Sequence, residues 1–562
     1  MATLVGIFAK KRSRTIGIIA CLAVGVLSIA VVVTTIIVER GTEVPLSVQP
    51  KVHGDLARQP IQTWDQSQQI TFPKDISRYS DNSCTSLQSD WVKQENNKPG
   101  VSMTNFDWQH LNLSTIHGSA LWLSQTSVNC GDKINIHASL YGSKLFDFES
   151  GVRTIEALRI GWYNGSGARE VWKSNPIKLK QYGVKKQRNA VRLIETNWPT
   201  TLTIPITKDW TPGFYLLLTR SPSGVIENAA PLVVHSPLGS SNLMVMHSFI
   251  TWATYNSFGG ASGYLGAGAT KVEQRLARTR VSSFDRPLVG SGGFSVHRDA
   301  ISLVQFMEEN GISADQYSDI DIENYPSIIT SYNGVVLGGH EEYFTRRMMD
   351  SMIAARNSGV NIAIFGANTA IWQTRLTESP VGKNRRVIMY RSATEDPVTK
   401  RDQVTVKYED PRVNYPATQF TAALTSGVHV YGTLKAKSIP SWLKISQNSS
   451  INGISPDSEV EKYVATAAAP PKVGIIFTGN MTYRDPTSLS IKGGIVPVAN
   501  TLWYTTPSGS AVFNAGVMTW SCDLIDTCAY STVDEKSRQV IDDVSLQVLK
   551  LWQIKEVGKT LK

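Results

Sequence analysis

The sequence predicts a membrane-anchored protein in which an antiparallel β-sandwich is followed by a doubly wound α/β domain. Three observations support this fold class. An uncharged apolar segment lies near the N-terminus, short alternating segments follow after a polar stretch, and the rest alternates buried strands with amphipathic helices. Apolar and charged fractions of 41% and 18% are globular values, and a length of 562 residues predicts several domains.

The first element is the apolar segment 15–38, preceded by a basic tail, residues 1–14. A membrane-spanning helix needs about 20 apolar residues, whereas the apolar part of a secretory signal is usually about 7–15 residues long. We therefore expect a signal anchor, with a cleaved signal peptide as the alternative. The basic residues precede the segment, which predicts a single-pass cell-membrane protein with a cytoplasmic N-terminus and an extracellular bulk.

The net charge of +10 does not indicate a nucleic-acid-binding protein. Four of the positive charges belong to the predicted cytoplasmic tail, and the others are scattered among acidic residues without a dense basic run. After the anchor, residues 39–117 are polar and show little periodicity, which is typical of a stalk or lead-in.

Residues 118–238 have the pattern of an Ig-like β-sandwich. Segments such as "INIHASL", "EALRIGWY" and "FYLLLTR" are rich in β-branched and aromatic residues, and several alternate with the period of a half-buried strand. Turn residues separate them, as in "YNGSG" and "DWTPG". Strands at this spacing favour an antiparallel sandwich.

Residues 239–562 have the pattern of an α/β domain. The segments "NLMVMHSFI", "GVVLGG" and "VNIAIFG" are continuous apolar strands, as expected for a sheet covered on both faces. Amphipathic segments such as "DAISLVQFMEENG" and "RRMMDSMIAARNSG" separate them. Near the C-terminus, Thr532 and Glu535 predict a capping box at the start of a helix. This alternation predicts parallel βαβ units in an open, doubly wound sheet.

Four of the five cysteines follow the predicted anchor. Cys522 and Cys528 enclose a short segment that a disulfide would close, and a Cys84–Cys130 bridge would follow by elimination, although other pairings of four cysteines are open. A zinc site made by the four thiolates is disfavoured because no C-x2-C pair is present.

Polar residues follow the predicted strand "GVVLGG" at the end where ligands of open α/β sheets gather. His340 and Glu342, one residue apart, are suited to metal ligation or to general acid–base catalysis. The alternative is structural: Glu341 and Glu342 would favour the positive N-terminus of the following helix, and His340 would be hydrogen-bonded in the loop.

Two further strand ends supply candidate residues. Asn368 in "GANTA" occupies a strand-to-helix turn where hydrolases carry a nucleophile, and since asparagine cannot act in that way, it would donate to a substrate carbonyl or stabilise the turn. Tyr255 and Tyr264 flank a glycine pair, and tyrosinate is a hard oxygen ligand suited to a ferric ion; loop packing is the alternative. The motifs of serine hydrolases, P-loop enzymes and zinc proteases are absent.

Several spaced motifs, within about residues 118–555, resemble one known family. They are "SQTSVNCGDKINIHAS", "LRIGWYNGSGAR", "TPGFYLLL", "ATYNSFGGASGY", "VSSFDRP", "LGGHEEYFT", "NIAIFGANTAIWQTRL" and "GVMTWS". In this order they are similar to the large (beta) subunit of N,N-dimethylformamidase and its relatives. The resemblance implies a β-sandwich followed by a glutamine-amidotransferase-like α/β domain.

The resemblance also implies a mononuclear ferric site, Fe(III), held by two tyrosines and a glutamate, that hydrolyses the C–N bond of a small amide. The family's His-x-Glu-Tyr pattern matches His340, Glu342 and Tyr343, which implies Glu342 as a ligand and His340 as an acid–base or substrate-orienting residue. Tyr255 is the first expected tyrosine ligand and Tyr264 the second. Relatives often read Arg-Pro-Tyr where this chain has Arg286-Pro287-Leu288. If that tyrosine is the second ligand in the family, this chain lacks it.

Together these observations predict an extracytoplasmic, iron-dependent hydrolase of C–N bonds in amide-type substrates. The competing hypothesis is a non-catalytic cell-surface binding protein on a degenerate hydrolase scaffold. The expected partners are a small amide-type substrate and the membrane, together with a small subunit or a second copy of the chain, and no nucleic acid.

Overall fold

The structure, a computed structural model, describes residues 64, 70–73, 75–80, 87–103, 118–141, 151–187, 189 and 191–561. By its contacts the chain divides into two units, Met1–Val52 and His53–Lys562. The first unit, which holds the predicted tail 1–14 and the predicted anchor 15–38, lies outside the described residues. All described elements belong to the second unit.

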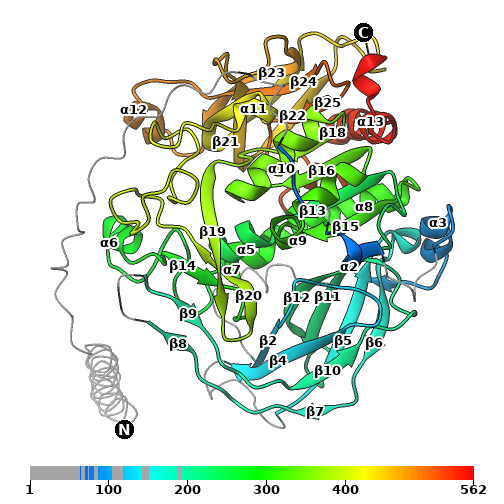
Figure 1. The fold of residues 1–562 in the computed structure, drawn as a ribbon, viewed down its shortest axis with the longest axis vertical. Helices are drawn as coiled ribbons and strands as arrows, with labels where there is room; N and C mark the ends of the chain where they lie inside the picture. The colour runs from blue at the N-terminus through cyan, green and yellow to red at the C-terminus, as the bar shows by residue number, and fades with distance from the viewer. Residues whose placement is uncertain are drawn as a thin grey trace, which may run out of the picture. The chain divides into compact units, whose positions relative to one another are not determined.

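Two β-sheets pack face to face in the N-terminal half of this unit (Figure 1). The larger follows the order β1 (Val101–Ser102), β6 (Gly167–Lys173), β5 (Val152–Ile160), β11 (Gly213–Arg220), β12 (Ile226–Val234) and β3 (Ser127–Val128), with β7 (Ile177–Lys178) beside β5. The smaller consists of β10 (Leu202–Pro205), β4 (Lys133–Tyr141) and β2 (Gly118–Leu123). Ile134 and Ile136 of β4 are buried with Tyr215 and Leu217 of β11, which is the two-residue period of half-buried strands.

A nine-stranded sheet forms the centre of the C-terminal half. Its order is β15 (Ala314–Ser318), β13 (Leu243–His247), β16 (Gly334–Gly339), β18 (Asn361–Gly366), β25 (Ala511–Asn514), β24 (Val498–Thr505), β23 (Gly474–Tyr483), β21 (Ala423–Ala436) and β22 (Ser450–Tyr463). The pairs from β15 to β25 are parallel, and those from β25 to β22 are antiparallel.

Helices cover both faces of the parallel half of this sheet. One face packs against α5 (Phe249–Tyr255), α9 (Asp319–Asn324) and α10 (Arg346–Asn357), and the other against α8 (Ser302–Glu309) and α13 (Glu535–Trp552). Alternate residues of β13 divide between the two cores: Met244 and Met246 lie in the first, and Leu243 and Val245 in the second. This double burial explains the continuous apolar strands.

Shorter elements complete the fold. A four-stranded sheet comprises β14 (Val281–Ser283), β20 (Gly382–Ile388), β19 (Trp372–Ser379) and β17 (Tyr343–Thr345), and β8 (Lys185–Lys186) pairs with β9 (Ile194–Glu195). The remaining α-helices are α2 (Ser77–Ser80), α3 (Trp91–Asn96), α6 (Lys271–Leu276), α7 (Gly290–Val296), α11 (Thr418–Thr421) and α12 (Thr487–Ile491). A π-helical turn, η2 (His297–Ile301), lies between α7 and α8, and 3-10 turns are η1 (Tyr163–Gly165), η3 (Pro326–Ser331), η4 (Cys522–Leu524) and η5 (Val557–Lys559).

The predicted doubly wound α/β sheet is wrong. Four of the nine strands form an antiparallel extension built from residues 423–505, and helices account for only 22% of the described residues. The strand–helix alternation between residues 243 and 366 explains the parallel half, but it carries no information about the long β21–β22 hairpin that follows. The C-terminal half is therefore a mixed sheet.

No helix within the described ranges is both long and apolar enough to cross a bilayer. The longest of them, α13, is amphipathic and buries one stripe of residues against the sheet. Within these ranges the structure therefore gives no support to the predicted membrane-anchored architecture or single-pass localisation, and the predicted anchor 15–38 lies outside them.

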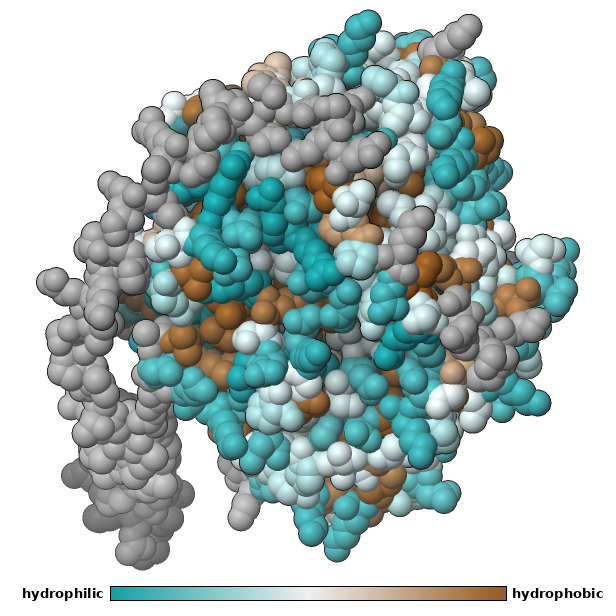
Figure 2. All heavy atoms as spheres, viewed as in Figure 1, coloured by the Kyte–Doolittle hydropathy of each residue, from teal (hydrophilic) through white to brown (hydrophobic). Residues whose placement is uncertain are grey.

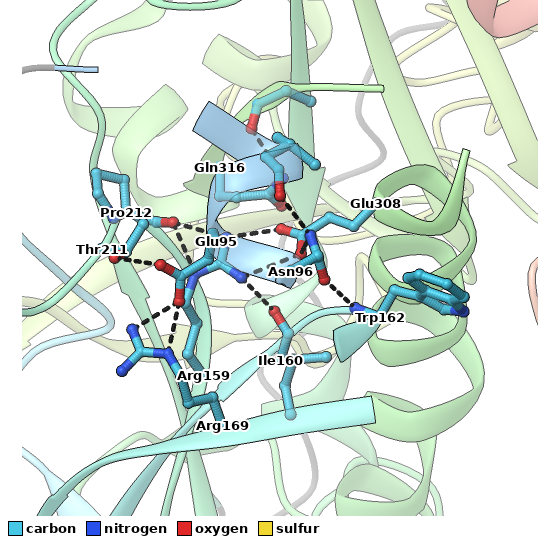
Figure 3. A network of polar contacts seen from close by, with 12 residues as sticks. Glu95, Asn96, Arg159, Ile160, Trp162, Arg169, Thr211, Pro212, Glu308 and Gln316 are labelled. Carbon is cyan, nitrogen blue, oxygen red and sulfur yellow. Dashed lines mark hydrogen bonds and ion pairs between the residues drawn. The ribbon is translucent and has the colours of Figure 1, made fainter. Parts of the chain in front are cut away.

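A buried polar network joins the sandwich to α8 and α3 (Figure 3). Arg159 on β5 is fully buried and lies 2.6 Å from Glu308 on α8. Asn96 on α3 donates to the other oxygen of Glu308, and its neighbour Glu95 pairs with Arg169 on β6. Because these charges come from different layers, the network fixes the layers against one another.

Cys522 and Cys528 form the predicted disulfide. Cys130 is also disulfide-bonded, and its predicted partner, Cys84, lies outside the described residues. The face seen in Figure 2 is mainly hydrophilic, with hydrophobic residues gathered around β14. Exposed apolar residues in and beside α6 include Leu265, Val272 and Leu276.

Candidate metal and catalytic site

Two glycines allow the polar residues that follow strand β16 to lie in the interior of the protein. Gly339 ends β16 with φ of 65°, and a Cβ atom there would meet the Asp299 carboxylate. A Cβ atom on Gly366, at the end of the neighbouring β18, would meet the Gly339 carbonyl oxygen. The two strand ends therefore approach as only glycines permit, and His340 and Glu342, which follow β16, are buried.

Glu342 is surrounded by tyrosine hydroxyls. The hydroxyl of Tyr255, at the end of α5, donates to Oε2 at 2.8 Å, and that of Tyr264 lies 2.7 and 2.6 Å from the two oxygens. The two hydroxyls are 3.1 Å apart. The indole nitrogen of Trp372 donates to Oε1 at 3.0 Å, and Tyr343 donates to the Tyr264 hydroxyl at 2.7 Å.

The structural alternative for this segment was that Glu341 and Glu342 favour the N-terminus of the following helix. The segment leads into β17, and α10 begins only at Arg346, where the side chain of Thr345 accepts from the Met348 nitrogen as the cap. Glu342 therefore does not cap the helix. Leu288, the family's alternative tyrosine position, is partly buried against an apolar cluster, whereas Tyr264 lies on Glu342.

The electrostatics of the cluster depend on burial. Burial raises the pKa of Tyr255 and of Tyr264 well above 10, and the nearby charge of Glu342 adds to both shifts. Burial also raises the pKa of Glu342, opposed by the hydrogen bonds from the two tyrosines. Both phenols are consequently protonated at neutral pH.

His340 lies against the same carboxylate. Its Nε2 is 3.6 Å from Glu342 and 3.8 Å from Glu459, and within the described part of the chain it makes no hydrogen bond. Burial lowers the pKa of His340 well below 6.5, and the charge of Arg298 adds to this shift. The imidazole is therefore neutral and has an available lone pair or proton.

Glu459 on β22 is a site residue that the sequence interpretation missed. Burial raises its pKa to about 8, and the charge of Glu342 contributes. The signal available in the sequence was the spacing of Glu459 and Glu461, which places two carboxylates on one face of a strand. Both face inward in the structure, and Glu461 accepts a hydrogen bond from the backbone nitrogen of Thr369.

Two arginines complete the charge pattern and were also missed. Arg298 in the π-helical turn η2 is 2.5 Å from Asp299, and π-helical turns often occur at functional sites. Arg391 adopts a left-handed backbone conformation with φ of 55°. Its guanidinium carbon lies 4.2 Å from the centroid of the Tyr264 ring, and one nitrogen is 3.4 Å from the Tyr343 hydroxyl.

Asn368 lies at the turn after β18 in the left-handed conformation, with φ of 59°. Its Oδ1 accepts from the hydroxyl of Thr425 at 2.5 Å. Among the described residues, no hydrogen bond joins Asn368 to the Glu342 cluster. The structure thus brings together His340, Glu342, Tyr255 and Tyr264, and places Asn368 in a turn.

A pocket of about 490 Å³ adjoins the cluster. Trp372 and Arg391 line it, and both also contact the cluster, so the pocket borders the cluster through these two side chains. In the part of the chain that the structure describes, no group of three or more His, Cys, Asp or Glu side chains is arranged to hold a metal ion. A metal at Glu342 would therefore depend on tyrosine oxygens.

Comparison with known proteins supports the resemblance. Residues 154–531 match the family described as N,N-dimethylformamidase beta subunit-like, C-terminal, a range that contains the whole Glu342 cluster. No curated protein matches the chain. One solved structure, a cycloisomaltooligosaccharide glucanotransferase of Paenibacillus sp. complexed with cycloisomaltoheptaose, has 9% identity and a TM-score of 0.16 over 72% of this chain and 68% of its own, and this similarity carries no argument.

Proposed function

Because this chain belongs to the N,N-dimethylformamidase beta subunit-like family, we propose that it hydrolyses the C–N bond of amide-type substrates at the Glu342 cluster. The observation that carries the proposal is the convergence of three oxygen-bearing side chains from separate elements. Tyr255 and Tyr264 both lie within 2.8 Å of the Glu342 carboxylate, beside a buried, neutral His340.

The donor set fits a ferric ion. Two phenols and a carboxylate are hard oxygen ligands, which Fe(III), a hard cation, prefers to softer ligands such as thiolates. Burial keeps both phenols protonated at neutral pH, and a trivalent cation is the kind of charge that reverses this. Bound there by Tyr255, Tyr264 and Glu342, the ion would act as a Lewis acid toward a substrate carbonyl.

The chain's own residues supply the proton transfers of the proposed reaction. Neutral His340 accepts a proton from the water that adds to the amide carbonyl carbon. Glu459, whose pKa of about 8 keeps it protonated at neutral pH, lies 3.8 Å from the imidazole and donates a proton toward the leaving nitrogen. Breakage of the C–N bond then releases the carboxylic acid and the amine.

The first test measures iron in the purified full chain. Expression with iron supplied should give about one equivalent per chain and a tyrosinate-to-iron absorption band in the visible range. The Glu342→Gln variant should lose the iron and the band but keep its circular dichroism spectrum, because the amide still accepts hydrogen bonds from the tyrosines.

Glu170→Gln, an exposed carboxylate of β6, is the matched control and should retain the iron. Unchanged iron content in Glu342→Gln would remove the ligand assignment. A folded wild-type protein that binds no iron and releases no amine from N,N-dimethylformamide or related amides would instead favour the non-catalytic binding protein.

A further inference from the structure

The pocket beside Trp372 is larger than the smallest amides require. Its volume of about 490 Å³ lies within the range of sites for drug-sized ligands, about 300–1,000 Å³. The lining residues are Trp372, Arg391, Ser392, Ala393, Thr394, Val406, Lys407, Glu409, Asp410 and Arg412. A substrate that fills this space has a substantial part beyond the reacting amide.

Backbone pairing holds a lysine beside the indole of Trp372. An isolated antiparallel bridge joins Trp372 and Lys407. On either side of it, Gln373 donates to the Val406 carbonyl and Tyr408 donates to that of Ile371, each at 2.9 Å. The Lys407 ammonium consequently lies 5.5 Å from the Trp372 ring centroid.

Arg391 places a second cation on the same indole. Its guanidinium carbon is also 5.5 Å from the Trp372 ring centroid. One terminal nitrogen donates to the Gly263 carbonyl at 2.5 Å, while Nε is buried and has no hydrogen-bond partner among the described residues. The backbone of Arg391 is in the left-handed conformation, with φ of 55°. A buried donor without a partner calls for an acceptor from a ligand.

The charges of the pocket do not cancel. Its two carboxylates are Glu409 and Asp410, and Asp410 is 2.5 Å from Arg412 in an ion pair. With Arg391, Lys407 and Arg412 beside these two carboxylates, the lining carries one net positive charge. Within the described ranges, neither Arg391 nor Lys407 has a carboxylate in salt-bridge distance. The pocket is therefore cationic around a planar aromatic surface.

We propose that this pocket selects amide substrates whose non-reacting end is planar and carries a carboxylate. The planar part lies along Trp372, the carboxylate meets Lys407 and the Arg391 Nε, and the amide carbonyl reaches Glu342. The proposal rests on the amide hydrolysis proposed above, and it names the substrate class. An aromatic amide acid is the simplest compound of this class.

The test compares two amides of the same shape with the full-length, iron-supplied protein. One is 4-(dimethylcarbamoyl)benzoate and the other is its neutral counterpart, N,N,4-trimethylbenzamide; both release dimethylamine on hydrolysis. The benzoate should have a kcat/KM at least about tenfold higher, mainly through KM, because a charged hydrogen bond to a buried donor is worth that much. The Glu342→Gln variant should be inactive, so calorimetric titration of this variant measures the binding of both compounds without their hydrolysis.

Lys407→Met removes one cation and keeps the length of the side chain. It should lower the benzoate-to-neutral ratio of kcat/KM, and the ratio of binding constants, about threefold to fivefold, as expected for an ion pair with an exposed lysine. Lys550→Met, at an exposed position of α13 that lines none of the described pockets, should leave both ratios unchanged.

The two proposals fail in different ways. Equal hydrolysis and equal binding of the two amides would overturn the pocket assignment and leave amide hydrolysis standing. Absence of hydrolysis, with tighter binding of the benzoate that Lys407→Met weakens, would support the pocket and overturn the proposed reaction. Equal binding without hydrolysis would overturn both.

Discussion

Burial controls the protonation of many carboxyl groups in this protein, outside the candidate site as well as within it. Asp523, in the turn that the Cys522–Cys528 disulfide closes, is fully buried, and burial raises its pKa to about 7. Burial likewise raises the pKa of Asp315 on β15 to about 6 and that of Glu461 on β22 to about 7. The folded chain therefore holds protons that the unfolded chain releases.

A first prediction concerns the pH dependence of stability. Since the pKa of Asp523 is higher in the folded state, its contribution is complete below about pH 4 and is lost as the pH rises toward 7. The free energy of unfolding should fall across this window, with a share on the order of 3 kcal/mol from Asp523. Urea unfolding at pH 5 and pH 8 measures the slope.

Asp523→Asn cannot titrate and keeps an oxygen for the hydroxyl of Thr519, which donates to Oδ2 in the native protein. The variant should lose stability less steeply between pH 5 and pH 8 than the wild type does. Asp209→Asn, at an exposed position of the sandwich, should follow the wild-type slope. An unchanged slope in Asp523→Asn would show that this carboxyl is ionised in the folded state.

Residue types and local spacing supplied the candidate residues of the site, and the family resemblance supplied their expected roles. Glu342, Tyr255 and Tyr264 belong to segments that follow buried strands, and the predicted neighbourhood of these side chains agrees with their contacts. Glu459 and Arg391 were missed because they reach the cluster from later strands and loops through long-range packing. A charged residue in an alternating strand is more often solvent-exposed, so its burial is visible only once the sheet is known.

At the scale of the elements, the position of the site depends on the close approach of β16 and β18. Parallel pairing continues to Gly339 and Gly366, and the chain then turns with a left-handed residue at Gly339. The absence of side chains at both glycines lets Asp299 of η2 and the Gly339 carbonyl approach. His340 and Glu342 are therefore positioned by backbone contact, which is more rigid than side-chain packing.

Substitution of Gly366 by alanine should separate these strands. The new Cβ atom would lie 1.7 Å from the Gly339 carbonyl oxygen if nothing moved, and a backbone atom cannot rotate away. We expect Gly366→Ala to lower the free energy of unfolding by at least about 2 kcal/mol and to weaken iron binding at Glu342. Denaturant unfolding and iron content provide the two measurements.

Gly183→Ala is the matched control. A Cβ atom at this exposed glycine meets nothing within 4 Å, so stability should change by no more than about 0.5 kcal/mol. If Gly366→Ala were as stable as the control and bound iron normally, β16 and β18 could separate at low cost. That result would contradict the proposed role of their close approach.

The elements differed in how far the sequence determined them. Strands β13, β16 and β18 of the parallel half were predicted from continuous apolar segments, because burial on both faces selects such residues, whereas β15, with the sequence ADQYS, was not predicted. The start of α13 was placed too early: Asp534, whose side chain accepts from the Ser537 nitrogen, caps the helix, and Thr532 lies outside it. The β21–β22 hairpin escaped prediction because glycine and proline interrupt its strands and their pairing has several register shifts.

At the scale of the whole unit, the sandwich and the C-terminal half are joined by charges that have no access to solvent. Arg159 makes hydrogen bonds to Glu308 and to the Tyr163 hydroxyl, as well as to backbone carbonyls. Buried pairs of this kind are costly to break because each leaves an uncompensated charge. The polar lead-in contributes to the same network through Glu95 of α3.

Arg159→Met should therefore destabilise the protein strongly. The substitution keeps the apolar part of the side chain but leaves Glu308 without its partner, at an expected cost of about 3–5 kcal/mol. Arg484→Met, which removes an exposed ion pair with Asp457, should cost no more than about 1 kcal/mol. Urea unfolding of the three proteins makes the comparison, and similar values for the two variants would contradict the structural role of the network.

The place of β25 in the central sheet has a consequence for how this chain matures. β25 is the last strand in the sequence, yet it lies between β18 and β24, where it joins the parallel strands to the antiparallel ones. During synthesis both halves of the sheet present open edges until residues 511–514 leave the ribosome, and such edges invite pairing with other chains. Nascent chains that stall before this point expose two unpaired strand edges, which are prone to aggregation. We therefore expect chaperones to protect the chain most before β25 is synthesised.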